Sequence, residues 1–522
     1  MGIPSYFKHL LDRYPLLLTP ASERPADILL VDFNCLIYGC IRSPKLPPYT
    51  NATRVFWEAA LLREVNDYVM KVWAAAGKPA QVFLAVDGVV PMAKMRQQRL
   101  RRFKSVWLAA QERGLGIRAP GQEFWDTNAI TPGTEFMEKL LRSLCSLSPN
   151  WIVSGANEEG EGEQKVMAWV RAQPAGSLDG KRIHVYGLDA DLILLCLLHC
   201  GVHAPAAVWN ILREKQEFGA KVADAKPKDV VFLTLSINGL LDVLFPESAS
   251  RRQRLYDYIC GMSLLGNDFL PHSLSVSIRD GGHDRLLHQL EGLWQNAEHL
   301  TDITGKVTVN RETLLHIVES WSQMEDDFVA RTFKKKYTMR GPPPRSEAER
   351  AMLPVQNLPL EWNAESALWH KDKGLSPSWS TNYYEDASQT DIHTRCATYC
   401  SGLQWILDYY TGQRPVSRSW MYPWSHPPLW TDLADYVRQS QTLPQPPPWR
   451  AEERPVQPQE QLAIVLPLES WSLIRDPHLR SVIDRLKPFW PKTFAFESLG
   501  KRWLWECEPK IPLLTPARLR LR

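Results

Sequence analysis

Acidic residues follow four short apolar segments in the first 200 residues, at the end of the segment or, after the third segment, beyond a glycine-containing loop. The apolar segments read "ILLV", "VFLAV", "WIVSG" and "HVYGL". A further aspartate lies in the apolar context "LLGNDFLPH". The seven candidates are Asp32, Asp87, Glu161, Glu163, Asp189, Asp191 and Asp268.

Such a set of carboxylates is typical of a metal site. Like charges packed together disfavour their mutual ionisation, and bound divalent cations relieve the repulsion. Oxygen-only ligands suit Mg²⁺ or Mn²⁺ rather than Zn²⁺. Two such ions about 3.5–4 Å apart can orient a water and stabilise both the attacking and the leaving oxygen of a phosphodiester. The competing interpretation is structural, because a lone aspartate after a strand usually caps the next helix.

The elements that must position these carboxylates are readable from the apolar segments. Strands are predicted over 27–32, 81–88, 151–155 and 183–191, because each is short and apolar on both faces, which is typical of buried parallel strands. Long helical stretches such as 53–77 and 134–147 separate them. The alternation predicts an α/β fold with a central, mainly parallel twisted sheet flanked by helices. Ligand sites form outside the carboxyl ends of such strands.

The glycines of "GEGE" bear on this geometry. Residues two apart on a helix diverge by about 200°. Gly160 and Gly162 permit a loop or first-turn conformation in which Glu161 and Glu163 both face the site.

The segment 94–104 reads "KMRQQRLRRFK" and contains no acidic residue. On a helix, four of its polar side chains fall within about 100° of arc, whereas Leu100, Phe103 and Trp107 fall on the opposite side. A cationic face beside an acidic cluster predicts phosphate binding, since Arg grips phosphate with paired hydrogen bonds and Lys adds a point charge. The alternative is a solvated helix face. The four residues are Lys94, Gln98, Arg101 and Arg102.

Composition sets the class of protein. The 522 residues carry a net charge of only +3, so any nucleic-acid signal must be local. Nine cysteines without C-x-x-C spacing indicate a reducing compartment, and no run of about 20 apolar residues predicts a membrane span. We expect a soluble intracellular protein with no membrane contact.

The chain divides into two predicted lobes. The segment 331–358 is basic and then proline-rich, which favours a linker between a larger lobe, 1–330, and a smaller lobe, 359–522. The lysines 334–336 are alternatively a nuclear-import signal. The second lobe is rich in Trp and Pro, and "SRSWMYPWSHPPLW" and "LPQPPPW" predict extended segments that pack on something.

These motifs resemble those of the Xrn-type 5′→3′ exoribonucleases, within the wider group of PIN and flap-endonuclease-like nucleases. The resemblance covers nearly the whole chain and rests on "MGIPSYFKHLLDRYP", "VDFNCLIYGC", "VDGVVPMAKMRQQRLRRFK", "GEGEQKVM", "YGLDADLILL", "LLGNDFLPH", "YCSGLQWILDYYTG", "SWMYPWSHPP" and "EQLAIVLP". The "PxAKMxQQRxRRF" block is the most specific, since ordinary flap endonucleases lack it.

The resemblance implies roles for named residues. It implies that the seven acids bind two divalent ions, Mg²⁺ or Mn²⁺. It implies that the four polar residues of the 94–104 helix form a pocket for a 5′-monophosphate that excludes capped and triphosphate ends. It also implies that Tyr38 and Trp420 stack on the first bases. The N-terminal segment with Pro4, Tyr6 and Phe7 resembles the element that blocks duplex RNA.

Several positions depart from the family pattern. Tyr38 stands where His is usual, and Met92 replaces a usual basic residue. Glu158 and Glu159 add charge beside the site, which is expected to alter its metal affinity. The chain ends soon after the second matching region and has no zinc knuckle, so we expect a minimal catalytic core.

The hypothesis is a processive 5′→3′ exoribonuclease that hydrolyses 5′-monophosphorylated single-stranded RNA to 5′-mononucleotides by two-metal-ion catalysis. One rival is a structure-specific flap endonuclease, and another is an inactive RNA 5′-end-binding scaffold. The expected partners are this RNA and decay or decapping factors. The protein is expected to be a monomer in the cytoplasm, with the nucleus as the alternative.

Overall fold

The chain folds around one seven-stranded sheet. A computed structural model describes residues 6–119, 121–215, 230–384, 388–450 and 454–521. The strands are β1 Leu18–Pro20, β2 Ile28–Asp32, β3 Gln81–Ala85, β4 Ile152–Ser154, β5 Arg182–Tyr186, β6 Val208–Glu214 and β7 Phe232–Ser236. Their spatial order is β1-β7-β6-β5-β2-β3-β4. The five strands from β6 to β4 are parallel, whereas β7 and β1 extend the sheet with antiparallel pairing. The α/β fold with a mainly parallel sheet is therefore confirmed.

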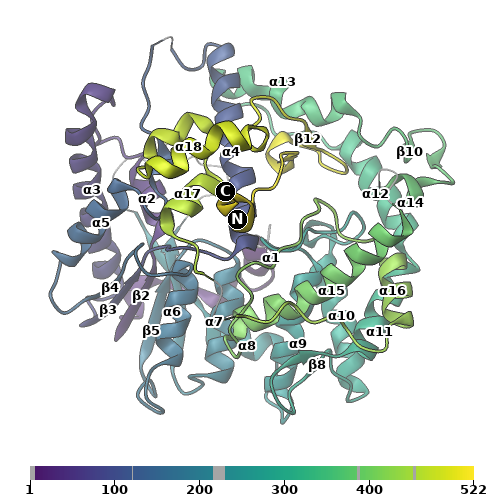
Figure 1. Ribbon diagram of the computed structural model, residues 1–522. Coiled ribbons are helices and arrows are strands. Elements are labelled where there is room, and N and C mark those ends of the chain that lie inside the picture. The colour runs from purple at the N-terminus through teal and green to yellow at the C-terminus, as the bar shows by residue number, and fades with distance from the viewer. Residues whose placement is uncertain (1–5, 120, 216–229, 385–387, 451–453, 522) are drawn as a thin grey trace.

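Helices cover both faces of the sheet (Figure 1). In the first half of the chain they are α1 Tyr6–Arg13, α2 Asn34–Cys40, α3 Arg54–Ala75, α4 Met92–Gly114, α5 Glu135–Cys145, α6 Gly162–Arg171, α7 Asp191–Val202, α8 Ile237–Leu244 and α9 Arg251–Leu264. The second half contains α10 Gly282–Gln295, α11 Arg311–Ser322, α12 Glu325–Thr338, α13 Glu347–Trp362, α14 Trp379–Asn382, α15 Gln389–Thr411, α16 Trp430–Gln439, α17 Pro458–Val465, α18 Pro477–Leu486 and α19 Pro516–Arg520. Three two-stranded pairs complete the fold: β8 Thr301–Asp302 with β9 Thr308–Val309, β10 Trp369–His370 with β11 Gly374–Leu375, and β12 Phe496–Glu497 with β13 Glu508–Pro509.

Two hydrophobic cores form because successive strand residues face opposite sides of the sheet. Ile28 and Leu30 of β2 pack with α6 and α7, and this core continues through α9 into α15 and α16. Leu29 and Val31 pack with α3 and α5, and this second core continues into α17 and α18. Figure 1 shows the yellow C-terminal helices beside α4, far from it in sequence. Side chains of the Trp- and Pro-rich region, 359–522, therefore pack in both cores together with those of residues 1–330.

The predicted strands and helices are confirmed within a few residues. The predicted strands correspond to β2, β3, β4 and β5, and the two predicted helices to α3 and α5. The prediction that β4 is buried on both faces is wrong, because β4 is an edge strand and Ile152 is half exposed. The proline-rich stretches contain no helix or strand at 412–429 and 440–450, as expected.

The predicted linker 331–358 is mostly helical. It contains the end of α12 and most of α13, which is capped by Ser346 and contains two prolines. Two of the lysines at 334–336 are occupied: Lys335 pairs with Asp280, and Lys336 is buried with Glu365, 2.7 Å between Nζ and Oε1. Lys334 and Lys335 are exposed, so the nuclear-import alternative stays a prediction.

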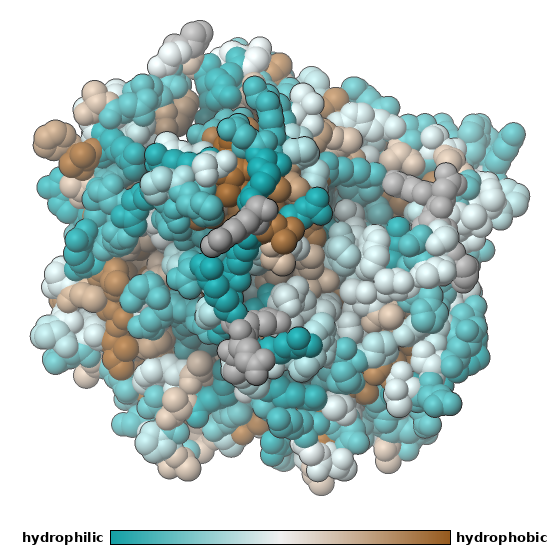
Figure 2. Space-filling view, viewed as in Figure 1, coloured by the Kyte–Doolittle hydropathy of each residue, from teal (hydrophilic) through white to brown (hydrophobic). Residues whose placement is uncertain are grey.

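Hydrophilic side chains cover most of the face in view, and apolar side chains appear on it in scattered patches (Figure 2). Within the described residues, none of the helices combines the length and apolar character that a membrane span needs.

Candidate active site

The predicted carboxylates lie at the carboxyl edge of the parallel strands. Asp32 ends β2 and pairs in register with Ala85, the last residue of β3. Asp87 follows two residues later. Asp189 follows Tyr186, the end of β5, by three residues. Because these strands are parallel neighbours, their following loops meet at one edge of the sheet.

Helix starts and one loop bring in the remaining acids. Glu161 is the N-cap of α6, Glu163 lies in its first turn, and Asp191 begins α7. Asp268 follows α9 and acts electrostatically on Asp191. Charge interactions also link Asp32 to Asp191 and Glu163. The structure therefore brings all seven predicted acids into one cluster.

Gly162 allows this close approach. Its backbone N–H donates to Asp87 Oδ1 at 2.7 Å. A Cβ added at Gly162 would lie 2.6 Å from Asp32 Oδ1 and 2.7 Å from the Ala85 carbonyl. Gly160 has φ +104°, a conformation that side chains other than glycine rarely adopt. The two glycines thus let the first turn of α6 contact two strand ends at once.

Two residues that orient these acids were not predicted from the sequence. Asn34, at the start of α2, donates from Nδ2 to Asp87 Oδ2 at 2.9 Å and accepts the Asp87 backbone N–H at 3.2 Å. Tyr409, on α15, donates from its hydroxyl to Glu161 Oε1 at 2.6 Å. Asn34 follows Asp32 closely in "VDFN", which is a usable signal. Tyr409 lies 248 residues from Glu161, so nothing local indicates the contact.

Lys94 belongs to the acidic cluster in this structure. Its Nζ lies 2.8 Å from Asp268 Oδ2 and 2.5 Å from Glu161 Oε2. The helical arc correctly placed Lys94 on the face of α4 toward the site. However, its partners here are two carboxylates, whereas the sequence predicted a phosphate.

The other predicted phosphate ligands lie further along α4. Gln98 is buried and accepts a hydrogen bond from Gln461 at 3.3 Å. Arg102 is 7% exposed, and its Nη1 is buried without a hydrogen-bond partner. Burial lowers the pKa of Arg102 to about 10 despite the nearby Tyr38 hydroxyl, which raises it. Arg101 is partly exposed, and its charge acts on Arg102.

The predicted stacking residues differ in their surroundings. Tyr38, on α2, is partly exposed and lies near Arg102. Trp420 is only 5% exposed and stacks on Trp405, with ring centroids 4.9 Å apart. Trp405 in turn stacks on Tyr409 at 4.9 Å. Trp420 is therefore a core residue here, behind the tyrosine that contacts Glu161.

The predicted duplex-blocking segment is described only from residue 6, so Pro4 lies outside the described residues. Tyr6 is fully buried, and its hydroxyl lies 2.7 Å from that of Tyr258. Phe7 lies beneath the guanidinium of Arg213 at 3.8 Å from the ring centroid. Both aromatic rings anchor α1 to the rest of the fold.

Burial and mutual repulsion control the ionisation of the cluster. Burial, followed by the charges of Asp87, Asp189 and Asp191, raises the pKa of Asp32 well above its ordinary range. Burial, Asp189 and Asp268 raise the pKa of Asp191 to about 7. Asp268 is the exception. Burial raises its pKa, but the charge of Lys94 lowers the pKa by more, so the net value is about 2.

Burial also raises the pKa of both glutamates of the cluster. For Glu163, the charges of Asp191 and Glu161 add to this effect. For Glu161, Lys94 and the hydroxyl of Tyr409 partly offset it.

This donor set fits divalent cations. Asp191 Oδ1 is buried and accepts no hydrogen bond, although burial of a carboxylate oxygen requires compensation. The oxygens are spread beyond one coordination sphere. Among the described residues, the one group of three or more His, Cys, Asp or Glu whose donor atoms all lie within 4.8 Å of one another is elsewhere, at His9. A cation would therefore draw carboxylates together in competition with Lys94.

Three departures from the family pattern lie at the edge of the site. Glu158 accepts a hydrogen bond from Ser154, and Glu159 pairs with Arg418. Both glutamates are exposed, so solvent screens their effect on the cluster. Met92 is buried at the start of α4.

Comparison with known proteins agrees with this geometry. Residues 1–215 match the sequence model of the XRN 5′-3′ exonuclease N-terminus, and residues 371–521 match that of the Xrn1 helical domain. Six of the seven acids and the whole of α4 lie in the first match, whereas Asp268 lies between the two.

Curated relatives match between about two thirds and the whole of the chain. The "5′-3′ exoribonuclease 2" of Gallus gallus is 26% identical over 100% of this chain and 69% of its own length. The "5′-3′ exoribonuclease 1" of Homo sapiens is 26% identical over 99% of this chain and 34% of its own length. The "5′-3′ exoribonuclease 2" of Debaryomyces hansenii is 31% identical over 65% of this chain and 39% of its own length. With an acidic cluster at the sheet edge and matches to both conserved regions, the chain belongs to the XRN family of 5′-3′ exonucleases.

Proposed function

We propose that the protein is a processive 5′→3′ exoribonuclease that hydrolyses 5′-monophosphorylated single-stranded RNA to 5′-mononucleotides. The observation that carries the proposal is the placement of α4. One end of this helix contacts the acidic cluster through Lys94, and two turns later it holds the unpaired, buried Nη1 of Arg102. An anion bound at Arg102 would therefore lie beside the carboxylates.

We infer that two Mg²⁺ (or Mn²⁺) ions are the cofactors of this site. The seven acids would hold them, as hard oxygen donors suit such ions. When bound, the ions supply charge neutralisation at the scissile phosphodiester and activation of water. The chain itself orients the ligands: Asn34 fixes Asp87, Tyr409 fixes Glu161, and Gly162 admits both strand ends to the first turn of α6.

The pocket for the terminal phosphate consists of Gln98, Arg101 and Arg102, with Lys94 between it and the acids. A buried cation without a partner is unfavourable, and a monophosphate supplies the missing hydrogen-bond acceptor. Gln98 and Arg102 are both buried, and the family resemblance implies that a pocket at this place excludes a triphosphate or a cap. Tyr38 lies beside Arg102, where it can stack on the first base.

The test compares internally labelled single-stranded RNAs that bear a 5′-monophosphate or a 5′-triphosphate, in Mg²⁺. We expect mononucleotides from the monophosphate RNA only. Glu163→Gln should lower the rate of hydrolysis by at least about 10–100-fold. Loss of an outer-shell partner of a metal already costs this much, and Glu163 is a direct ligand in the proposal. Glu159→Gln, in an exposed acid nearby, should leave the rate unchanged.

The phosphate pocket has its own control on the same helix. Arg102→Gln should raise the KM for the monophosphate RNA at least about 10-fold, because one charge-assisted hydrogen bond is lost. Arg113→Gln, exposed in the last turn of α4, should not change the KM. Equal KM values for Arg102→Gln and the unmodified protein would contradict the pocket.

The rival functions give different results in these assays. Cleavage of a circular RNA or of a DNA flap would indicate an endonuclease. Tight binding of the monophosphate end without cleavage would indicate an RNA-binding scaffold. We propose that the protein acts as a monomer in the cytoplasm, with the nucleus as the alternative, beside decay or decapping factors. Its nine cysteines are all free thiols, which agrees with a reducing compartment.

A further inference from the structure

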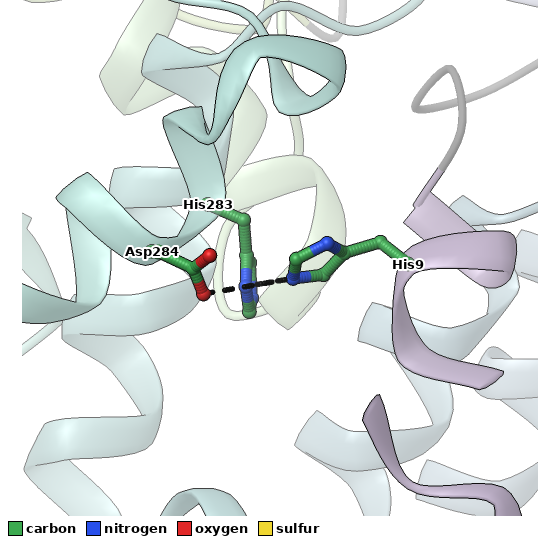
Figure 3. Close-up of side chains that lie close together, drawn as sticks. All are labelled: His9, His283 and Asp284. Atoms are coloured by element: carbon green, nitrogen blue, oxygen red, sulfur yellow. Dashed lines mark hydrogen bonds and ion pairs between the residues drawn. The ribbon is translucent and has the colours of Figure 1, made fainter. Parts of the chain in front are cut away.

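Two imidazoles and a carboxylate meet where α1 contacts the start of α10. His9 Nε2 lies 3.0 Å from His283 Nδ1 and 3.7 Å from Asp284 Oδ1. The three side chains point toward one another from two helices, and His9 and His283 are 274 residues apart in the sequence (Figure 3). Within the described part of the chain, this is the one group of three potential ligands whose donor atoms all lie within 4.8 Å of one another.

The distances suit a small tetrahedral ion. Ligands at 2.0–2.1 Å from Zn²⁺ lie about 3.3 Å from one another in a tetrahedron. The separations of His9 Nε2 from its two neighbours bracket this value. The donor atoms of the third pair, His283 and Asp284, lie within 4.8 Å of each other, and His9 and Asp284 are accessible enough for a bound ion to draw the three groups together.

The surroundings of His283 match those of a metal-binding histidine. The ring is fully buried, and its Nε2 lies 2.7 Å from the hydroxyl of Tyr258, which lies 2.7 Å from that of Tyr6. A metal-bound histidine usually donates its second N–H to an oxygen, which fixes the ring and its tautomer. With Nε2–H donating to Tyr258, the lone pair of Nδ1 faces His9.

Arg13 is a nearby cation that opposes a metal. It pairs with Asp284, and both side chains are about half exposed. A ligating carboxylate commonly accepts a second hydrogen bond from an outer residue. Arg13 contacts Asp284 Oδ1, the same oxygen that lies 3.7 Å from His9 Nε2, so a bound ion requires the half-exposed Arg13 side chain to turn to the second oxygen of Asp284.

We propose that His9, His283 and Asp284 form a binding site for Zn²⁺ that links α1 to α10, separate from the acidic cluster. Two imidazole nitrogens and one carboxylate oxygen suit Zn²⁺, Co²⁺ or Ni²⁺ and are a poor set for Mg²⁺. Three protein ligands leave a fourth position for water. The site would fasten the first described helix of the chain to the nuclease core.

The test uses the full chain in excess Mg²⁺, which occupies the oxygen-ligand site, with Zn²⁺ added by equilibrium dialysis and counted by elemental analysis. We expect one more Zn²⁺ per chain in the unmodified protein than in His9→Gln, whose affinity should fall at least about 100-fold. His288→Gln, exposed on the same helix α10, should bind like the unmodified protein. Tyr258→Phe should weaken binding by about 10–100-fold, because it removes the outer hydrogen bond.

The variants also separate a metal site from a plain hydrogen bond between two imidazoles. Glutamine at position 9 can still hydrogen-bond to His283, so His9→Gln removes a metal ligand but not the contact between the helices. If the two imidazoles only share a hydrogen bond, Zn²⁺ should leave the melting temperature of every variant unchanged. The proposal predicts that Zn²⁺ raises the melting temperature of the unmodified protein and of His288→Gln, but not of His9→Gln. Equal Zn²⁺ counts in His9→Gln and the unmodified protein would overturn the proposal.

Discussion

At the scale of single residues, the acidic cluster acquires its chemistry from burial. Asp32, Glu163 and Asp191 are each almost fully buried beside other carboxylates, so their charged forms are disfavoured without a cation. Lys94 forms ion pairs with Asp268 and Glu161. Its charge also lowers the pKa of Asp32, Glu163 and Asp191, but for these three acids burial and the neighbouring carboxylates outweigh it. The site is therefore least stable when it is fully ionised and metal-free, which is the condition that favours cation binding.

The first prediction concerns the pH dependence of stability without metal. The pKa of Asp191 is raised to about 7, so this group contributes stability below pH ~4 that is lost as the pH rises through ~7. In EDTA, the melting temperature should therefore fall as the pH rises from 5 to 8. The corresponding loss in the free energy of unfolding should be on the order of a few kcal/mol. Saturating Mg²⁺ should remove most of this slope.

Asp191→Asn is the control for that experiment. It removes one buried charge with little change of shape, so the variant should lose part of the pH slope in EDTA and also lose activity. A melting temperature that rises with pH over the same range would contradict the account of the cluster.

Tyr409→Phe tests whether the region that matches the Xrn1 helical domain, residues 371–521, orients Glu161. The change removes the 2.6 Å hydrogen bond but keeps the ring that stacks on Trp405. We expect kcat to fall about 10–100-fold with an unchanged KM for RNA, as for other outer-shell partners of a metal. The affinity for Mg²⁺ should also be weaker, so half-maximal activity should need a higher Mg²⁺ concentration. Tyr436→Phe, partly exposed on α16, is the matched control. An unchanged kcat would show that Glu161 is held without Tyr409.

At the scale of elements, the start of α6 determines how closely the strand ends meet. Gly162→Ala places a methyl group within 2.7 Å of Asp32 Oδ1 and the Ala85 carbonyl, so the helix must shift. We expect a loss of stability of about 1–3 kcal/mol and a loss of most activity. Gly292→Ala in α10 meets nothing within 4 Å and should gain about 0.5–1 kcal/mol, as measured by chemical denaturation. Full activity in Gly162→Ala would contradict the role of this turn.

The sequence predicts some elements well because their signal is local. Apolar segments located β2, β3 and β5, since central parallel strands are apolar on both faces. β6 lacks that signal because it contains the buried Asn210 and Arg213. The segment 331–358 is predicted as a linker because it is basic and then proline-rich, although Ser346 followed by Glu349 is a capping signal for α13, which also contains Pro354 and Pro359.

The same reasoning applies to the site. The strand ends and the helical arc of α4 depend on short-range periodicity, so the seven acids and the face of α4 were predictable. The partners of Lys94 and the burial of Trp420 depend on how distant segments pack, which a single sequence does not show. Tyr409 and Glu161 are joined by the same long-range packing.

At the scale of the whole molecule, residues 371–521 pack against the elements that carry the site. α15 packs into the same core as α6 and α7, and α17 packs against α4. The stack of Trp420, Trp405 and Tyr409 leads from this region to Glu161. The predicted two-lobe division therefore describes sequence segments whose side chains share two cores.

The most direct measurement follows the products of one RNA that carries a 5′-monophosphate and a label at either the 5′ or the 3′ end. The account predicts that, in Mg²⁺, the 5′ label appears at once as a mononucleotide. The 3′ label should stay in full-length RNA until late, and a circular RNA of the same sequence should stay intact. Early internal fragments, or cleavage of the circle, would contradict the claim that the acidic cluster and the phosphate pocket of α4 act together on a 5′ end.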